Sequence, residues 1–74
     1  MTVRTELPCV QILLTRFQEF DQGMPIDQEL PAEWKLEPDD IVNWECAQFD
    51  GQAVVISCDE PKGQTVSCTL EKIS

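Results

Sequence analysis

The sequence contains no histidine among its 74 residues. This absence excludes Ser-His-Asp and Cys-His nucleophiles, zinc sites that use imidazole, and the usual pH switch near neutrality. The sequence also lacks a glycine-rich phosphate loop, a nucleophile elbow and a lysine in an apolar setting. We therefore expect no enzymatic activity, no catalytic residue, no cofactor and no metal ion.

Long apolar runs are absent too. The densest run, residues 10–14, is far shorter than the roughly 20 residues that a membrane-spanning helix needs. The first residues lack the basic region and apolar stretch of a secretory signal. These absences predict a cytoplasmic protein with no membrane association.

Basic residues are scarce, with 5 Lys and Arg against 14 Asp and Glu, so the net charge is −9. Such a surface repels nucleic acid phosphates and attracts basic protein surfaces. The charge therefore predicts a protein partner with a basic surface and disfavours nucleic acid. The alternative is that the charge only keeps the chain soluble.

A chain of this length forms one small domain, residues 1–74. Its apolar content of 42% is enough for a core. Chains of this size bury only about 60% of their unfolded surface, so the core is marginal. A homodimer is therefore an open alternative to a monomer.

Residues 7–20 carry apolar side chains at helical spacing. Pro8 suits the first helical position, and Gly23 suits the end of the helix. Several β-branched residues in the same segment leave a strand as the alternative. The apolar positions are Leu7, Val10, Leu13, Leu14, Phe17 and Phe20.

The next segment, residues 24–36, is interrupted by Pro25 and Pro31. Asp27 is a candidate N-cap for a short helix over residues 28–30, which Pro31 would bend or restart. Three side chains of this segment are expected to face the core: Leu30, Trp34 and Leu36.

Alternating apolar residues after residue 40 predict three antiparallel strands with one buried face. Turns are expected at residues 37–40, 50–51 and 61–63. The fold class is α+β, mainly β: a C-terminal three-stranded antiparallel meander, with one or two short helices in the N-terminal half. Dimerisation could complete such a half-barrel. The expected inward residues are Val42, Trp44, Cys46, Val54, Ile56, Cys58, Val66, Cys68 and Leu70.

The first hairpin allows two registers. A two-residue loop at Asp50-Gly51 would pair Cys46 with Val55 and place the apolar residues of the two strands on opposite faces. A three-residue loop over residues 50–52 pairs Cys46 with Ile56 and keeps one apolar face. The second register is therefore favoured.

The four cysteines contain no C-x-x-C pair, which disfavours a zinc ribbon. In the favoured register Cys46 and Cys68 lie two strands apart, roughly 9.5 Å, and Cys58 is diagonal to both. Disulfides need Cα atoms within about 7 Å. We expect three buried thiols and no disulfide. Cys9 is expected to be exposed, with Arg4 as its basic neighbour.

Adjacent carboxylates at Asp39 and Asp40 fit a turn better than a metal site, because no third ligand follows at EF-hand spacing. Carboxylates near this turn could imitate a row of phosphates, and Trp34 could anchor an interface. The candidate partner-binding residues are Glu29, Glu33, Trp34, Glu37, Asp39 and Asp40.

Residues 22–57 resemble the AbrB/MazE-type swapped-hairpin domain. The matching positions are Ile26, Glu29, Leu30, Leu36, Pro38, Asp40 and Val42, followed by Asp50-Gly51 and Val54-Val55-Ile56. The resemblance implies an intertwined homodimer whose N-terminal strands contact DNA, as in antitoxins and transition-state regulators. Acidic residues stand here where that family carries basic ones: Glu19, Asp21 and Asp27.

Three functions follow as hypotheses. The first is a non-catalytic acidic module that inhibits or regulates a basic, nucleic-acid-handling protein. The second is a DNA-binding regulator of the AbrB type. The third is a small structural subunit of a larger complex.

Overall fold

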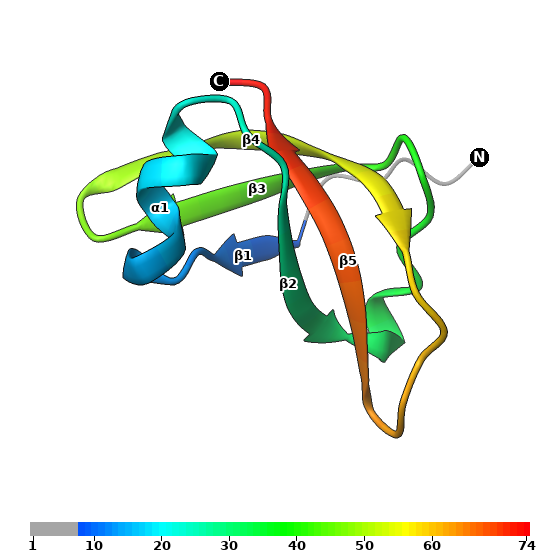
Figure 1. Ribbon diagram of the computed structural model, residues 1–74. Coiled ribbons are helices and arrows are strands. Elements are labelled where there is room, and N and C mark those ends of the chain that lie inside the picture. Colours follow the sequence, from blue (N-terminus) through cyan, green and yellow to red (C-terminus); the bar gives the residue numbers. More distant parts are fainter. Residues whose placement is uncertain (1–7) are drawn as a thin grey trace.

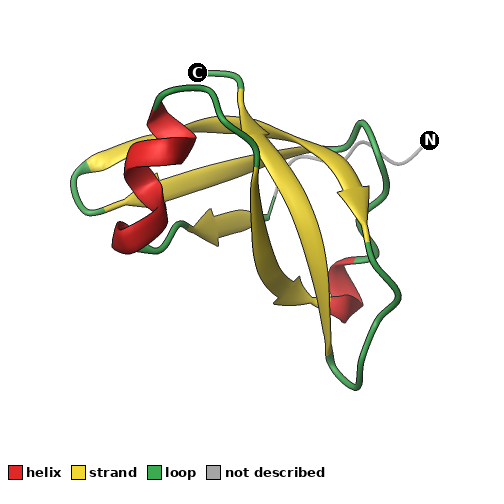
Figure 2. Ribbon diagram, in the orientation of Figure 1, coloured by secondary structure: helices red, strands yellow, loops and turns green. Residues whose placement is uncertain are grey.

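Strands dominate the computed structural model, which describes residues 8–74 (Figures 1 and 2). A single sheet has the order β1-β3-β4-β5-β2 and is curled into a half-barrel, with α1 packed against its inner side. This confirms the predicted mainly-β class and the antiparallel meander β3-β4-β5. The elements are β1 (Cys9–Gln11), α1 (Leu14–Asp21), β2 (Ile26–Pro31), the short 3-10 helix η1 (Ala32–Trp34), β3 (Ile41–Cys46), β4 (Phe49–Cys58) and β5 (Thr65–Lys72).

The first segment contains both a strand and a helix. Val10 of β1 is buried and pairs in parallel with Trp44 of β3. Pro8 precedes this strand and accepts a hydrogen bond from the Asn43 N–H, so its predicted place at the start of a helix is wrong. The helix begins only at Leu14, because the main chain of Pro8, Val10 and Ile12 is already paired with β3. The expectations for Leu7 and Arg4 fall outside the described residues.

Gly23 follows α1 with a φ of 89°, as predicted. Left-handed backbone of this kind costs glycine no steric penalty. The chain thereby reverses into β2.

The predicted short helix over residues 28–30 is wrong, because this segment is β2, antiparallel to β5. Ile26 and Leu30 are both buried, and the interval between them suits a strand as well as a helix turn. Instead of capping a helix, Asp27 accepts a hydrogen bond of 2.6 Å from Thr69 Oγ1.

The hairpin between β3 and β4 turns at residues 47–48, where Ala47 has a φ of 54°. Cys46 pairs with Phe49 across this turn. Both the predicted turn at Asp50-Gly51 and the favoured three-residue loop are therefore wrong. The inward residues of β4 are Ala53 and Val55.

Val54 and Ile56 were expected to face inward. Val54 instead lies between the buried Ala53 and Val55 and faces outward, and Ile56 is 41% exposed. A register shift between Val55 and Ser57 marks a bulge that leaves Ile56 unpaired. Sequence alternation does not reveal such a bulge, since one extra residue exchanges the two faces.

The bulge also overturns the prediction of three free buried thiols. Cys58 pairs directly with Cys68 across β4 and β5, with Cα atoms 4.0 Å apart, and the two form a disulfide. Cys46 is buried and free, and Cys9 is exposed, both as expected.

The core lies between the inner face of the sheet and α1. Phe20 is fully buried and meets the Trp44 ring edge-on, with ring centroids 5.1 Å apart. Phe17 contacts Trp44 and stacks on Phe49 at 5.4 Å. Trp34 and Leu36 pack against this core from one side, and Leu30 is buried, as predicted.

Candidate acidic interaction surface

The six predicted partner-binding residues come from β2, η1 and the turn before β3. Glu29 lies on β2, and Glu33 is exposed in η1. The Ala32 N–H donates to the Gln64 carbonyl at 2.8 Å, which fixes η1 against the β4-β5 loop. These two carboxylates are therefore presented by anchored backbone.

A carboxylate within the turn over residues 37–40 stabilises that turn. Asp40 Oδ2 accepts a hydrogen bond of 2.8 Å from the Glu37 N–H, so Asp40 stabilises the turn. The Asp39 N–H donates to the Val55 carbonyl at 2.7 Å, which attaches the turn to β4. Glu37 and Asp39 remain exposed and can face a partner.

Trp34 is half-buried against the core. Much of its ring therefore contributes to folding, and only the remaining part can contact a partner. The role of Trp34 as an interface anchor stays a prediction.

An open hollow of about 750 Å³ lies beside η1. Glu29 and Glu33 line it, together with residues 63–65, which end the β4-β5 loop and begin β5. Leu30, Pro31 and Ala32 also line the hollow. The arrangement suits an aliphatic stem with a cationic head, as in Lys or Arg.

A second acidic surface, the outer acidic face, lies on the convex side of the sheet. Among residues 8–74, the outward positions of the five strands hold five carboxylates and no Lys or Arg. Glu45 and Asp50 stand directly opposite each other on β3 and β4. The carboxylates of the outer acidic face are Asp27, Glu29, Glu45, Asp50 and Glu71.

Four of these residues are not among the predicted partner-binding residues. Asp27 was assigned to a helix cap and Asp50 to a turn, while Glu45 and Glu71 were given no role. The alternation around Glu45 already indicated an outward side chain. Its proximity to Asp50 depends on the hairpin register, which the sequence did not define.

Cys9 responds to the charge of this face. Partial burial raises the pKa of its thiol, and the carboxylates of Glu45 and Asp50 raise that pKa further. Both effects disfavour the thiolate. The negative potential at this end of the outer acidic face therefore acts on a neighbouring group.

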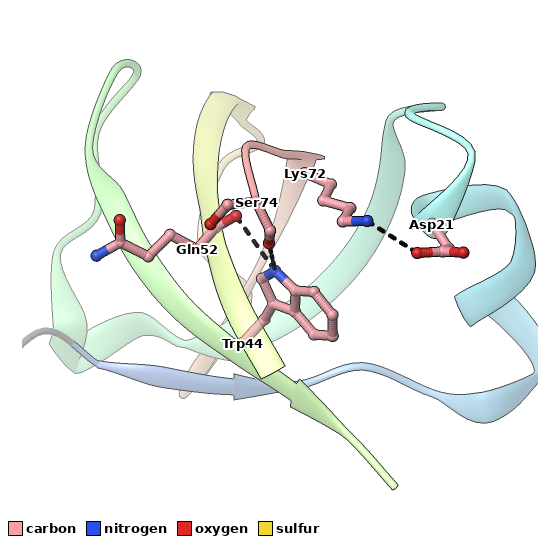
Figure 3. A network of polar contacts seen from close by, with 5 residues as sticks. All are labelled: Asp21, Trp44, Gln52, Lys72 and Ser74. Atoms are coloured by element: carbon pink, nitrogen blue, oxygen red, sulfur yellow. Dashed lines mark hydrogen bonds and ion pairs between the residues drawn. The ribbon is translucent and has the colours of Figure 1, made fainter. Parts of the chain in front are cut away.

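Cations are dispersed over the part of the chain that the structure describes. Lys72 Nζ pairs with Asp21 Oδ1 at 2.8 Å and joins β5 to the end of α1 (Figure 3). Arg16, Lys35 and Lys62 lie in three separate segments: α1, the residue after η1 and the β4-β5 loop. Within residues 8–74 these cations therefore do not line one strand or one helix, unlike the clustered basic residues that DNA binding uses.

No group of three or more Cys, Asp or Glu side chains is placed to hold a metal ion in residues 8–74. No helix of this part is long and apolar enough to cross a membrane.

Comparison with protein families, with curated proteins and with solved structures finds no match to this chain. The resemblance to the swapped-hairpin family therefore stays a prediction.

Proposed function

We propose that this protein is a non-catalytic acidic module that binds a basic surface on another protein, as an inhibitor or accessory regulator of a nucleic-acid-handling partner. The observation that carries the proposal is the outer acidic face, with its five carboxylates and no Lys or Arg among the described residues. Carboxylates presented by paired strands lose little freedom on binding Lys or Arg, which favours association. The hollow beside η1 supplies a second contact for a cationic side chain.

The proposal is tested by affinity capture from nuclease-treated lysate, elution with a salt gradient and mass spectrometry. We expect one stoichiometric partner with a basic surface, released as salt rises, because salt screens exposed charges. The variant E45Q/D50N/E71Q should elute the partner at lower salt. E19Q/D59N/E60Q removes three exposed carboxylates outside the outer acidic face, so it is the matched control and should elute like the unchanged chain.

The acidic turn is tested separately with E37Q/D39N. Asp40 is left unchanged because it accepts the Glu37 N–H, and Asn tolerates the left-handed backbone of Asp39. Earlier elution of this variant would assign the turn a part in binding. Elution of every variant at the salt concentration of the unchanged chain would refute the charge-based proposal.

The DNA-binding alternative is examined with a labelled DNA duplex at low salt. We expect no binding, because the dispersed cations supply few phosphate contacts. A complex whose affinity falls steeply with salt would replace the acidic module by a DNA-binding regulator.

For the compartment we propose the cytoplasm, where a nucleic-acid-handling partner would be met. The Cys58–Cys68 disulfide bears on this point, because cytoplasmic disulfides are usually transient or redox-sensing. Alkylation in rapidly acid-quenched cells distinguishes the cases. Free thiols at both positions in growing cells agree with the cytoplasm, and a fully oxidised pair contradicts it.

A further inference from the structure

Among residues 8–74, β1 and β2 form the two edges of the half-barrel, and neither pairs with a further strand on its outer side. The Asn43 N–H donates to the Pro8 carbonyl and the Ile12 N–H donates to the Glu45 carbonyl, so the even-numbered residues of this segment face β3. The main-chain groups of Cys9 and Gln11 therefore point away from β3.

The hydrogen bonds between β2 and β5 identify the residues on the free edge of β2. The Ala32 N–H donates to the Gln64 carbonyl, in line with the β2-β5 register, so the even-numbered residues face β5. Main-chain pairing alternates along an antiparallel ladder. The N–H and C=O groups of Asp27 and Glu29 therefore point away from β5.

These two free edges approach each other, and we call the gap between them the seam. Figure 1 shows β1 and β2 at the two ends of the curled sheet, and Gln28 Nε2 donates to the Gln11 carbonyl across the gap. A hollow of about 440 Å³ lies here, lined by Gln11, Leu13, Arg16, Asp27, Gln28 and Glu29. A single side-chain amide thus bridges strands whose main chains are not paired with each other.

Gln28 is an unusual residue for its position. It lies between the buried Ile26 and Leu30 on the inward side of β2, where an apolar residue would fit the pattern. Its Oε1 atom is buried and accepts no hydrogen bond from the described residues. An acceptor without a donor is costly in such a place, and a segment that displaces the Gln28 amide from the seam would relieve that cost.

We propose that the seam receives an extended, basic segment of the partner as an added strand. The main chain of that segment pairs with the free edge of β2 at Asp27 and Glu29 and takes over from the Gln28 amide at the Gln11 carbonyl. Main-chain pairing gives the affinity, and Lys or Arg at alternate positions meet the carboxylates of Asp27 and Glu29. This inference rests on the proposed function, since it assumes a basic partner.

A second copy of the chain is a poorer occupant. A strand from another copy would come from a chain with a net charge of −9. Dimerisation through β2 would also bring two sets of Asp27 and Glu29 together, and like charges on paired strands are destabilising. The hollow at the seam is lined by two carboxylates against one cation, Arg16, so charge favours a basic segment over self-association.

The test uses the full chain, isotope-labelled, and a capped synthetic peptide of alternating Lys and Val. Amide hydrogen exchange at Asp27 and Glu29 should slow by about tenfold or more at saturation, since exchange requires that a new hydrogen bond open. A Lys-Val peptide methylated on every main-chain nitrogen has the same charge, but it has no N–H to donate and cannot form the ladder. It should leave these amides unprotected.

Two variants separate main-chain pairing from charge. E29P removes the N–H that faces the seam and should weaken binding of the Lys-Val peptide by about five- to tenfold, the equivalent of one hydrogen bond. E29Q removes only the charge and should retain the protection. If E29P fails to fold, Q28V supplies the readout, because removing the bridging amide frees the Gln11 carbonyl and should raise the affinity for the Lys-Val peptide. An unchanged or lower affinity of Q28V would contradict the displacement of that amide.

Equal protection by both peptides, or protection confined to other strands, overturns the seam proposal. Protection that grows with protein concentration and needs no peptide also overturns it, by assigning the seam to a second copy. The proposed function survives those results if the salt-dependent partner is still captured. It fails separately if E45Q/D50N/E71Q and E37Q/D39N change nothing in the capture experiment.

Discussion

Gly51 owes its place in β4 to the last residue of the chain, Ser74. A Cβ atom at position 51 would overlap the main-chain oxygen of Ser74. That oxygen also accepts the indole N–H of Trp44 at 3.1 Å, as Figure 3 shows. Glycine is needed here for close approach between two backbones, and not for a left-handed turn.

The substitution G51A should destabilise the fold by about 1–3 kcal/mol, because an added methyl group forces the end of the chain away from β4. Urea unfolding followed by Trp fluorescence measures the loss, and the indole N–H signal of Trp44 should shift. G63A is the control: Gly63 has a φ of 65° and open space around it, so that variant pays backbone strain alone. An unmoved Trp44 signal in G51A would contradict the contact.

The alkylation of Cys9 tests how neighbouring carboxylates act on a single residue, through its pH dependence. Its pKa is raised above the ordinary value of 9.0 by partial burial and then by Glu45 and Asp50, so less thiolate exists at any pH below that range. Alkylation of Cys9 should be slower than that of a model thiol at pH 8 and should reach half its maximum rate above pH 9. E45Q/D50N should accelerate labelling at pH 8. Equal rates in the two proteins would show that the carboxylates do not act on the thiol.

At the scale of elements, α1 is held by one fully buried side chain. Phe20 is 0% exposed, whereas Leu14 on the same helix is 75% exposed. F20A should cost about 3–5 kcal/mol, because it removes a core side chain and its edge contact with Trp44. L14A should change the free energy of unfolding by less than about 0.5 kcal/mol. Similar losses of unfolding free energy in the two variants, measured by urea titration, would show that α1 does not pack on the core through Phe20.

The β4-β5 hairpin is closed by the Cys58–Cys68 disulfide, which gives a stability prediction. Reduction should lower the free energy of unfolding by about 2–4 kcal/mol, the usual range for a disulfide. Alkylation after denaturation without reductant should label only Cys9 and Cys46. C58S/C68S should be insensitive to reductant, and C9S should respond like the unchanged chain. Four labelled thiols in an oxidised sample would disprove the bond.

Features of the fold that are set by neighbouring residues could be predicted from the sequence. Local alternation predicted the inward faces of β3 and β5, and local turn chemistry predicted the turn at residues 37–40. The C-terminal half of the predicted helix is also confirmed, since Phe17 and Phe20 have helical spacing and lie in α1. These features depend on neighbouring residues alone.

The features that were missed depend on distant residues. The residues on the inner face of β4 depend on the turn at Ala47 and on the bulge near Ile56. The strand β1 forms by parallel pairing with β3, which lies more than 30 residues later in the chain. The disulfide follows from the same bulge. Of the candidate surface, the residues near the turn were predicted, but the pairing of Glu45 with Asp50 required the register.

On the scale of the whole molecule, charge opposes folding. A net charge of −9 on a chain of 74 residues repels itself in the compact state. Raising the salt from about 10 mM to about 150 mM shortens the screening length from about 30 Å to about 8 Å. The unfolding temperature should therefore rise with salt in a thermal scan followed by circular dichroism. E45Q/D50N/E71Q should show a smaller rise, and a temperature that falls with salt would contradict the repulsion.

The disulfide also determines what a protease can release. Residues 59–67 lie between Cys58 and Cys68, and the exposed loop at Gly63 is the natural place for a cut. A chain nicked there stays in one covalent piece, with β5 still joined to β4, and separates only after reduction. The loop is therefore a suitable place to insert a short epitope tag, since both ends of the insert are fixed by the bond behind it.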